Sequence, residues 1–378
     1  MPDPVYPVQM VRVEKCTVRI LLVITGLGVG GAERQVCDLA DGFTRLGHAV
    51  KLVYLTGSVA VKPVSANVEI RGLGLGKSPI SLWKALAVFK SEVAEFKPDI
   101  VHSHMFHANI FARFARLNCA MPRLISTAHN TSEGGRFRSL LYRATDYLAD
   151  ISTNVSEEAV EAFVLNGAAP RGRMVVVYNG IDLSRFDRVK IAPQSSSEGD
   201  LVLLAVGRLY PQKDYPNLLR AFSLLPSTSL GRKLRLDIVG DGPERSKLEA
   251  LVKKLGVEDR VHFLGMRSDV PSLMKRADIF VLSSAWEGFG LVVAEAMACG
   301  RRVVATDCGG VAEVLGDNGV LVAPHDCEKL AQGIREALAM SPDESERLGD
   351  SARRHVEQTF SMDAVLSRWE ELYAAGVR

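Results

Sequence analysis

The chain has 378 residues, 47% of them hydrophobic and 24% charged, which is the composition of a globular protein with two or three domains. Its formal net charge of +2 gives no indication of a nucleic-acid partner, since such partners require a strongly basic surface. No run approaches the roughly 18 apolar residues of a membrane-spanning helix. The six cysteines show no C-x-x-C spacing, which favours reduced thiols in a cytoplasmic protein over a disulfide framework or a zinc site.

Short β-branched runs alternate with helical patterns through the first half of the chain, and this alternation predicts βαβ units around a parallel sheet. The predicted strands are Arg19–Thr25, Ala49–Leu55, Ile100–Ser103, Leu124–Ala128, Ile151–Val155 and Met174–Tyr178. A helix is predicted over Ala32–Leu46, because its apolar side chains form one stripe and Gly47 supplies a stop. Right-handed crossovers between such strands give a doubly wound α/β/α domain.

A second domain of the same kind is predicted after a turn at Asn179–Asp182 and a polar linker at Gln194–Gly199. Its predicted strands are Leu201–Val206, Leu234–Val239, Val261–Leu264, Asp278–Leu282 and Arg302–Ala305. The two domains are therefore placed at residues 1–182 and 183–359. The last helix, Met362–Tyr373, is amphipathic and needs an apolar partner surface. Because functional loops follow the carboxyl ends of parallel strands, a cleft between the two sets of loops is the expected ligand site.

The first strand is followed by the glycine-rich sequence Gly26-Leu-Gly28-Val-Gly30-Gly31. The spacing of Gly26, Gly28 and Gly31 matches the dinucleotide fingerprint, which favours NAD. That fingerprint also expects an acid at the end of the second strand, where this chain has Thr56. The remaining inference is physical: glycines let the backbone approach a ligand closely, and the helix N-terminus beyond them attracts an anion. A plain tight turn is the alternative.

Two cations follow the first strand of the second domain. Arg208 offers a planar fork of donors and Lys213 a mobile point charge, a combination that suits a leaving diphosphate. A solvated surface pair is the alternative. No D-x-D pair occurs in the sequence, so the usual carboxylate clamp for a metal-chelated nucleotide sugar is missing.

A second anion-binding signal is the sequence Trp286-Glu287-Gly288-Phe289-Gly290-Leu291, which precedes a helix predicted over Val292–Cys299. The glycines leave the first amides of this helix free to point at an anion, and the helix dipole adds to the attraction. Glu287 precedes the helix and Glu295 lies in its second turn. Because the helix is apolar nearly all round, it should be buried, and a buried carboxylate needs partners. Ribose hydroxyls are expected for Glu295 and sugar hydroxyls for Glu287.

Together these motifs resemble the retaining GT-B glycosyltransferases of family four, over nearly the whole chain. The resemblance is carried by Gly30-Gly31-Ala-Glu33-Arg34, Thr127-Ala-His129, Val155-Ser156, Asn179-Gly180-Ile-Asp182, Gly207-Arg208 with Lys213, Val239-Gly-Asp-Gly-Pro-Glu244, Phe263-Leu-Gly265 and the E-x7-E pair Glu287 and Glu295. It implies two Rossmann-like domains that face a central cleft, with a C-terminal helix, residues 360–378, crossing back to the N-terminal domain. A nucleoside diphosphate sugar would bind mainly to the C-terminal domain, and the acceptor would face the N-terminal domain.

The resemblance also implies roles for single residues. Arg208 and Lys213 would bind the diphosphate, and Glu295 the ribose. Glu287 would hold the donor sugar, and His129 would act at the reaction centre. The other implied donor-binding residues are Gly30, Gly31, Gly265, Met266, Gly288, Phe289, Gly290 and Leu291. As the anomeric bond breaks, the cations and the helix amides would stabilise the charge that grows on the diphosphate, so no metal or other cofactor is expected.

The expected reaction is the transfer of a hexose or N-acetylhexosamine, with UDP as the carrier on family frequency, to a glycan or a polyprenyl-diphosphate-linked acceptor. The expected product is a bacterial surface polysaccharide or glycolipid such as O-antigen, capsule or exopolysaccharide. The alternatives within the fold are a UDP-N-acetylglucosamine 2-epimerase and an inverting transferase. A nucleotide- or NAD-binding oxidoreductase and a noncatalytic sugar-nucleotide sensor are the alternatives from other classes.

The acceptor side is predicted from His104, His107 and Asn130. His102, His104 and His107 form H-x-H-x-x-H after a strand, a pattern that could serve either a metal site or polar contacts to acceptor or sugar. Polar contacts are favoured, with structural packing as the alternative. No metal ligand is assigned.

A basic flank follows these histidines, with six arginines and one acid between residues 104 and 143. On the helix predicted there, the aromatic residues fall on one side and Arg113 and Arg116 on another. This pattern is typical of a segment that rests on anionic lipid, although core packing explains the aromatic residues equally well. The hypothesis is peripheral contact with the inner face of the cytoplasmic membrane through Arg113, Arg116, Arg136 and Arg138.

Overall fold

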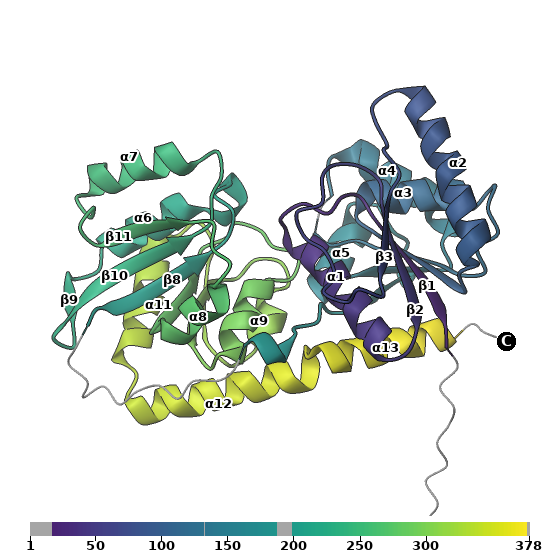
Figure 1. The fold of residues 1–378 in the computed structure, drawn as a ribbon. Coiled ribbons are helices and arrows are strands. Elements are labelled where there is room, and N and C mark those ends of the chain that lie inside the picture. The colour runs from purple at the N-terminus through teal and green to yellow at the C-terminus, as the bar shows by residue number, and fades with distance from the viewer. Residues whose placement is uncertain (1–16, 132, 187–198, 376–378) are drawn as a thin grey trace, which may run out of the picture.

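The computed structural model describes residues 17–131, 133–186 and 199–375, which form two α/β domains (Figure 1). The predicted linker Gln194–Gly199 lies outside the described residues except for its last glycine. The final three residues of the predicted C-terminal segment lie outside them too.

The N-terminal domain is built on a seven-stranded sheet in the order β3-β2-β1-β4-β5-β6-β7, and every pair of neighbours is parallel. Its strands are β1 (Arg19–Ile24), β2 (Ala49–Tyr54), β3 (Glu69–Gly72), β4 (Ile100–His104), β5 (Leu124–Thr127), β6 (Ile151–Asn154) and β7 (Met174–Val176). Its helices are α1 (Gly31–Arg45), α2 (Pro79–Phe96), α3 (Phe106–Ala115), α4 (Arg136–Thr145) and α5 (Glu157–Leu165), with 3-10 turns η1 (Asp146–Leu148) and η2 (Leu183–Arg185). The strand order changes direction between β1 and β4, so a crevice is expected at their carboxyl ends.

The C-terminal domain repeats this plan in the order β11-β10-β8-β12-β13-β14, with β9 antiparallel to β10. Its strands are β8 (Leu201–Val206), β9 (Thr228–Ser229), β10 (Arg232–Val239), β11 (Val261–Gly265), β12 (Ile279–Leu282), β13 (Arg302–Thr306) and β14 (Val320–Val322). Its helices are α6 (Tyr215–Ser223), α7 (Arg245–Leu255), α8 (Val270–Arg276), α9 (Leu291–Ala298), α10 (Val311–Leu315), α11 (Cys327–Ala339) and α12 (Pro342–Thr359), with a 3-10 turn η3 (Pro211–Lys213). The predicted pair of doubly wound domains is confirmed.

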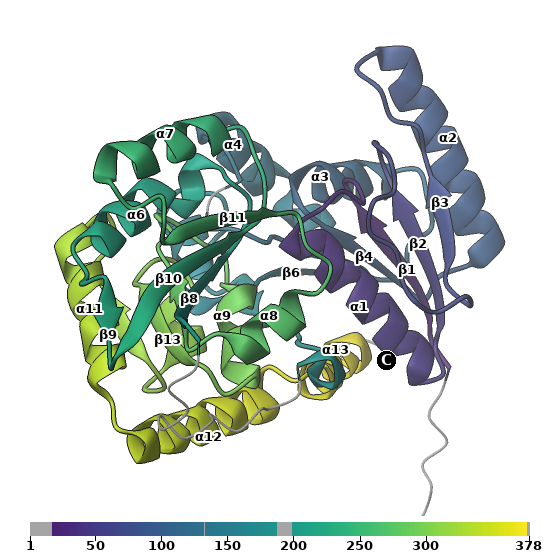
Figure 2. The same cartoon turned by 60° about the vertical axis from the view of Figure 1, so that its left-hand side comes forward.

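The two C-terminal helices connect the domains. In Figures 1 and 2, α12 runs along the C-terminal domain and α13 (Met362–Ala374) continues beneath the N-terminal domain. There α13 inserts Leu366, Trp369 and Tyr373 into the core that α1 and β1 also form. Where the chain crosses, Ile181 exchanges backbone hydrogen bonds with Phe360 and Met362 at 2.7 and 2.9 Å. The predicted crossing helix and its apolar partner surface are therefore confirmed.

A second connection joins the domains at the start of α5. The Glu313 carboxylate of α10 accepts the backbone N–H groups of Glu157 and Glu158, both at 2.9 Å. In return, the Glu158 carboxylate accepts the N–H of Gly309 at 3.1 Å. Each domain thus caps backbone donors of the other, and a carboxylate at a helix N-terminus is also favoured by the helix dipole.

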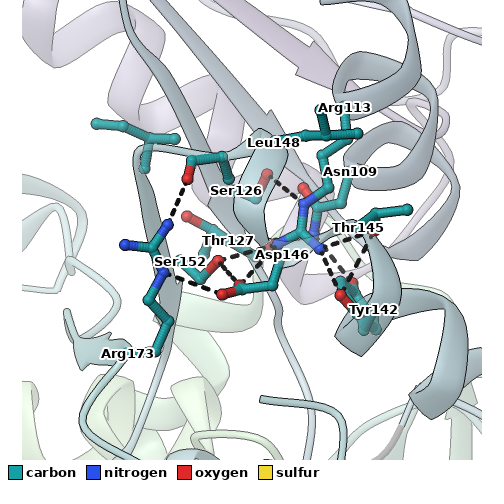
Figure 3. A network of polar contacts seen from close by, with 12 residues as sticks. Asn109, Arg113, Ser126, Thr127, Tyr142, Thr145, Asp146, Leu148, Ser152 and Arg173 are labelled. Carbon is teal, nitrogen blue, oxygen red and sulfur yellow. Dashed lines mark hydrogen bonds and ion pairs between the residues drawn. The ribbon is translucent and has the colours of Figure 1, made fainter. Parts of the chain in front are cut away.

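Arg113 of α3 lies in the interior of the N-terminal domain, where it is 1% exposed. Its guanidinium donates to the Ser152 hydroxyl at 2.9 Å and lies 3.6 Å from the Asp146 carboxylate (Figure 3). The predicted contact of Arg113 with lipid is therefore wrong, because polar partners from other elements hold the side chain inside. Arg116 also pairs within the fold, at 2.8 Å from Asp150.

The aromatic residues of α3 belong mainly to the core as well. Phe106 and Phe111 are buried and only Phe114, at 45%, is exposed. Core packing, and not contact with lipid, therefore explains most of the aromatic residues of α3. Within the described part of the chain, no helix has the length and apolar character to cross a membrane.

Candidate active site

Three strand ends of the C-terminal domain meet at one closely packed edge. Gly240, after β10, donates its N–H to the carbonyl of Gly265 at 2.9 Å. A Cβ added to Gly240, whose φ is +135°, would lie 2.0 Å from the carbonyl oxygen of Gly207. Only glycine fits such a close approach. Arg208 and the exposed Met266, both predicted donor-binding residues, therefore follow β8 and β11, the two strands that flank β10.

Lys213 and Glu287 form an ion pair at this edge. The Lys213 ammonium lies 2.5 Å from Glu287 Oε1, and the Ser284 hydroxyl donates to the same oxygen at 2.6 Å. The side chains of Lys213 and Glu287 are 17% and 10% exposed, so the pair is largely desolvated. The ion pair thus joins two residues with separate predicted roles, Lys213 at the diphosphate and Glu287 at the donor sugar. The three donors of the ammonium allow Lys213 to contact an anion while it still holds Glu287.

The start of α9 is the candidate site for an anion. Gly290 is its N-cap with φ of 88°, and no side chain among the described residues caps the helix. Its first backbone amides therefore remain available to an anion. A Cβ on Gly31 would lie 3.1 Å from a methyl carbon of Leu291, so the glycine loop before α1 faces this helix start across the domain interface. The predicted donor-binding residues Gly30, Gly31, Gly290 and Leu291 are thereby brought together.

Glu295 projects from α9 toward charges of the other domain and of the connection between the domains. Burial raises its pKa to about 7, with the positive charges of Arg185 and Arg34 opposing the rise and the carboxylate of Asp38 adding to it. The carboxyl of Asp38 is affected in the same way, with burial raising its pKa to about 6. The Glu295 carboxyl is therefore poorly solvated, and its pKa lies close to neutral pH. Hydroxyl donors of a ligand would stabilise its charged form.

His129 and Asn130 meet the Glu287 loop from the N-terminal domain. A Cβ on Gly288 would lie 2.1 Å from the carbonyl oxygen of His129 and 3.1 Å from Cα of Asn130. The hydroxyl of Ser156 donates to the Gly288 carbonyl at 2.9 Å. Gly288 therefore lets the two domains touch beside the Lys213–Glu287 pair, and the predicted reaction-centre histidine lies next to it.

The other predicted acceptor residues are placed differently. His104 is fully buried and lies 3.1 Å from His129 between their ring nitrogens. Contact between His104 and an acceptor is thus a wrong prediction, because no part of its side chain reaches the surface. The side chain of His107 is exposed at the start of α3, and partial desolvation of its ring together with the charge of Arg138 lowers its pKa. The described residues contain no group of three side chains suited to a metal ion.

Several residues of the site had no assigned role in the sequence analysis. Ser284 holds Glu287, and its spacing of three residues before that carboxylate is a signal that could have found it. Glu33 folds back over Gly30, and its pKa is raised by burial against the influence of its own backbone hydrogen bond and of Arg208. Glu133 accepts the N–H of His129 at 3.1 Å and a short hydrogen bond from Tyr142. No local pattern indicates that last contact.

Comparisons with known proteins agree with this arrangement. The family described as Glycosyl transferases group 1 matches residues 187–355, and Glycosyltransferase Family 4 matches residues 29–185. D-inositol 3-phosphate glycosyltransferase of Geodermatophilus obscurus is 32% identical, over 91% of this chain and 82% of its own length. N-acetyl-alpha-D-glucosaminyl L-malate synthase of Bacillus anthracis is 29% identical, over 91% and 94%. The crystal structure of Anabaena HepE in complex with UDP has a TM-score of 0.80 at 22% identity, covering 95% of this chain and 100% of that one.

Two Rossmann-like domains that face each other across these loops define the GT-B fold. The chain belongs to the glycosyltransferases of group 1, family four. Its activity is accordingly glycosyl transfer, which sets aside the oxidoreductase that the glycine spacing alone would suggest.

Proposed function

We propose that the protein transfers a hexose or N-acetylhexosamine from UDP to a glycan or lipid-linked acceptor, with retention of the anomeric configuration and without a metal ion. The observation that carries this proposal is the desolvated Lys213–Glu287 pair beside the open N-terminus of α9. UDP as the carrier is supported by the complex of HepE with UDP.

The charges of the site suggest how the reaction proceeds. Negative charge grows on the diphosphate as the anomeric bond breaks, and Arg208, Lys213 and the α9 amides would stabilise it. Glu287, fixed by Lys213 and Ser284, would accept hydrogen bonds from the sugar and hold it in orientation. The acceptor would attack from the face that the diphosphate leaves, and the leaving phosphate would take the acceptor proton. With this set of positive groups, the leaving group needs no divalent cation.

The donor is tested by thermal shift with UDP-, GDP- and ADP-sugars, followed by hydrolysis and transfer assays with the sugar that binds. Stabilisation by a UDP-sugar, turnover in EDTA and an α-linked product from an α-linked donor are expected. An inverted product or a strict metal requirement would refute the mechanism, whereas preference for GDP or ADP would replace the carrier.

The role of Glu287 is tested by Glu287→Ala with Glu258→Ala, an exposed glutamate of the same domain, as the control. Loss of a positioned polar group at a reaction centre costs about 10²–10³ in kcat. We expect that loss for Glu287→Ala and none for Glu258→Ala, with both proteins folded by circular dichroism. Near-normal turnover of Glu287→Ala would reject its assignment.

A lipid-linked acceptor is supported by an exposed face of α4 and the turn after it. Phe137, Leu140 and Tyr147 are 76%, 65% and 76% exposed, and the exposed Arg136 and Arg143 lie among them. Aromatic, aliphatic and basic side chains on one face favour an anionic membrane surface. We therefore place the proposed contact with the inner face of the cytoplasmic membrane here, and the proposed product is a bacterial surface polysaccharide or glycolipid.

Flotation with anionic liposomes tests this surface. The variant Arg136→Gln/Phe137→Ser/Leu140→Ser should stay at the bottom of the gradient, while wild type floats. Lys253→Gln/Lys254→Gln on the exposed side of α7 should float like wild type. Equal flotation of wild type and both variants would show that this surface of α4 does not bind the membrane. Transfer to soluble L-malate or inositol phosphate, without flotation of the wild type, would favour a small anionic acceptor instead.

A further inference from the structure

The corner between η3 and α6 is formed by Asp214, the residue that follows Lys213. Asp214 is both the C-cap of η3 and the N-cap of α6, with φ of 43° and ψ of 46° in the left-handed region. Residues with a Cβ rarely adopt that conformation, although aspartate tolerates it because its short side chain can hydrogen-bond locally. The direction in which the chain leaves η3 therefore depends on this one residue.

The residues on either side of Asp214 both reach Gly207, directly after β8. The hydroxyl of Tyr215 donates to the Gly207 carbonyl at 3.0 Å. A Cβ added to Gly207 would lie 3.0 Å from Cε of Lys213 and 3.2 Å from the Tyr215 hydroxyl. The left-handed corner thus directs both side chains to the end of β8, and from there the Lys213 ammonium reaches Glu287.

Two groups hold the side chain of Asp214. Its Oδ1 accepts the N–H of Asn217 in the first turn of α6 at 3.4 Å, and its Oδ2 lies 2.8 Å from Nδ1 of His325. Because a carboxylate only accepts, Nδ1 of His325 is the donor. The side chain of Asp214 is 17% exposed and that of His325 is 66% exposed, so water partly screens this contact and its effect should be modest.

His325 connects the corner to a separate part of the C-terminal domain. It lies in the loop between β14 and α11, and its own φ of 60° is also left-handed. The Ser283 hydroxyl, from the loop after β12, donates to the Lys213 carbonyl at 2.8 Å and so fixes the backbone before the corner. The contact of His325 with Asp214 fixes the corner residue itself, on which the positions of Lys213 and Tyr215 depend.

We propose that Asp214, held by His325, is a positioning residue for Lys213: the contact keeps the corner left-handed and so keeps the Lys213 ammonium beside Glu287, where it meets the donor diphosphate. This inference rests on the proposed role of Lys213 as a diphosphate ligand. His325 itself touches no part of the donor and acts through Asp214 alone.

UDP and uridine separate this role from a general loss of structure. Uridine lacks the diphosphate, so a displaced Lys213 should weaken the binding of UDP and leave that of uridine unchanged. Glycine at position 214 or 325 keeps the left-handed conformation accessible while it removes the side chain. We expect Asp214→Gly and His325→Gly each to bind UDP about two- to fivefold more weakly, the size of one partly exposed hydrogen bond. Titration calorimetry measures UDP, and ligand-observed NMR measures uridine.

Three further variants complete the design. Asp214→Asn keeps an acceptor for His325 and a cap for α6, so it should retain most of the UDP affinity. The double variant Asp214→Gly/His325→Gly should lose no more affinity than Asp214→Gly, because both substitutions break the same contact. Leu230→Gly is the matched control and should bind both ligands like wild type. Leu230 is also left-handed, with φ of 52°, but it lies in the β9–β10 turn, at the opposite end of the sheet from Gly207.

Wild-type UDP affinity in Asp214→Gly would show that the corner needs only its backbone conformation, and the proposal would then be overturned. Equal losses for UDP and uridine, or additive losses in the double variant, would overturn it too. Lys213→Met identifies which idea has failed. If Lys213→Met binds UDP weakly and Asp214→Gly binds it normally, the positioning role alone is wrong. If Lys213→Met binds UDP normally, the diphosphate role of Lys213 is wrong, and the positioning role falls with it.

Discussion

Arg113 carries a positive charge into the interior of the N-terminal domain, and its partners make that position stable. Besides Ser152 and Asp146, its guanidinium reaches the hydroxyls of Ser126 and Thr145 at 3.3 and 3.2 Å. Figure 3 shows these side chains converging from several elements. Removing Arg113 would take its donors from this buried set, while Asp146 would keep Arg173 at 3.0 Å and the Ser152 hydroxyl at 2.7 Å.

We therefore expect Arg113→Met to destabilise the N-terminal domain by about 1–3 kcal/mol, because buried oxygens would lose a charged donor and Asp146 would keep only Arg173 as a counter-charge. Arg116→Met is the matched control on the same turn: its ion pair with Asp150 is 23% and 39% exposed, and the expected cost is about 1 kcal/mol or less. The measurement is the midpoint of the first urea transition. Similar shifts for both variants would contradict the buried role of Arg113.

Glu295 leads to a prediction about pH. Its pKa of about 7, raised mainly by burial, means that much of the carboxyl is protonated below neutrality, and a protonated carboxyl is a poorer acceptor for ribose hydroxyls. UDP affinity should therefore fall as the pH drops from 8 to 6, by up to about tenfold per unit below the pKa. Titration calorimetry of wild type and Glu295→Gln tests this. The variant should bind weakly with a flatter profile, and equal profiles would reject Glu295 as the ribose ligand.

The raised pKa of Glu295 also makes the free energy of unfolding depend on pH. Between the ordinary value of 4.5 and the folded-state pKa of about 7, the folded protein keeps a proton that the unfolded chain releases. The contribution of Glu295 to stability therefore falls as the pH rises through this window. Asp38, whose pKa burial raises to about 6, adds a slope of the same sign. Comparison of Glu295→Gln with wild type isolates the part due to Glu295.

Among single residues, the sequence could identify those that follow a recognisable local pattern, but it could not identify their partners in the fold. Recognisable glycines or strand ends precede Arg208, Lys213, Glu287 and Gly290, and the structure pairs Lys213 with Glu287. On the predicted helix, Arg113 falls on a different side from the aromatic residues, and that pattern predicts a side chain that faces lipid. Its burial depends on Ser126 and Ser152, which come from other strands and leave no mark on the helix pattern.

Among the elements, the central strands were predicted within a residue or two because they are buried on both faces and rich in β-branched residues. The predicted Arg19–Thr25 is β1, Arg19–Ile24, and the predicted helix Val292–Cys299 is α9, Leu291–Ala298. The edge strands β3 and β14 were not predicted. They are short, and the exposed side chains along β3 give no apolar run to recognise.

α13 illustrates an element whose stability depends on a distant surface. Trp369 is 2% exposed and packs with α1 and β1, while Arg368 beside it is exposed and pairs with the exposed Glu371. Trp369→Ala should lower the free energy of unfolding by about 3–5 kcal/mol, because it leaves a cavity. Arg368→Ala should change it by no more than about 0.5 kcal/mol. Thermal unfolding followed by circular dichroism measures both. A small effect of Trp369→Ala would show that α13 is not a structural part of the N-terminal domain.

For the whole molecule, the arrangement of the domains depends on contacts at two ends of the interface. The α12–α13 connection holds one end, and the reciprocal carboxylate contacts of Glu313 and Glu158 hold the other. The contacts of Gly31 with Leu291 and of Gly288 with His129 lie on the same interface. A weakened contact at α5 would therefore change how the donor and acceptor sides meet without changing either domain.

Glu313→Ala tests this dependence. Loss of the carboxylate leaves the N–H groups of Glu157 and Glu158 without their partner, a cap worth about 0.5–2 kcal/mol, and the interface should open more often. We expect a larger radius of gyration in small-angle scattering and a lower kcat/KM, with the circular dichroism spectrum retained. Glu161→Ala, an exposed position on α5, should match wild type in all three measurements. Because UDP would contact mainly the C-terminal domain, its affinity should change less than turnover. A fall in UDP affinity as large as the fall in kcat/KM would instead place the damage within the donor site.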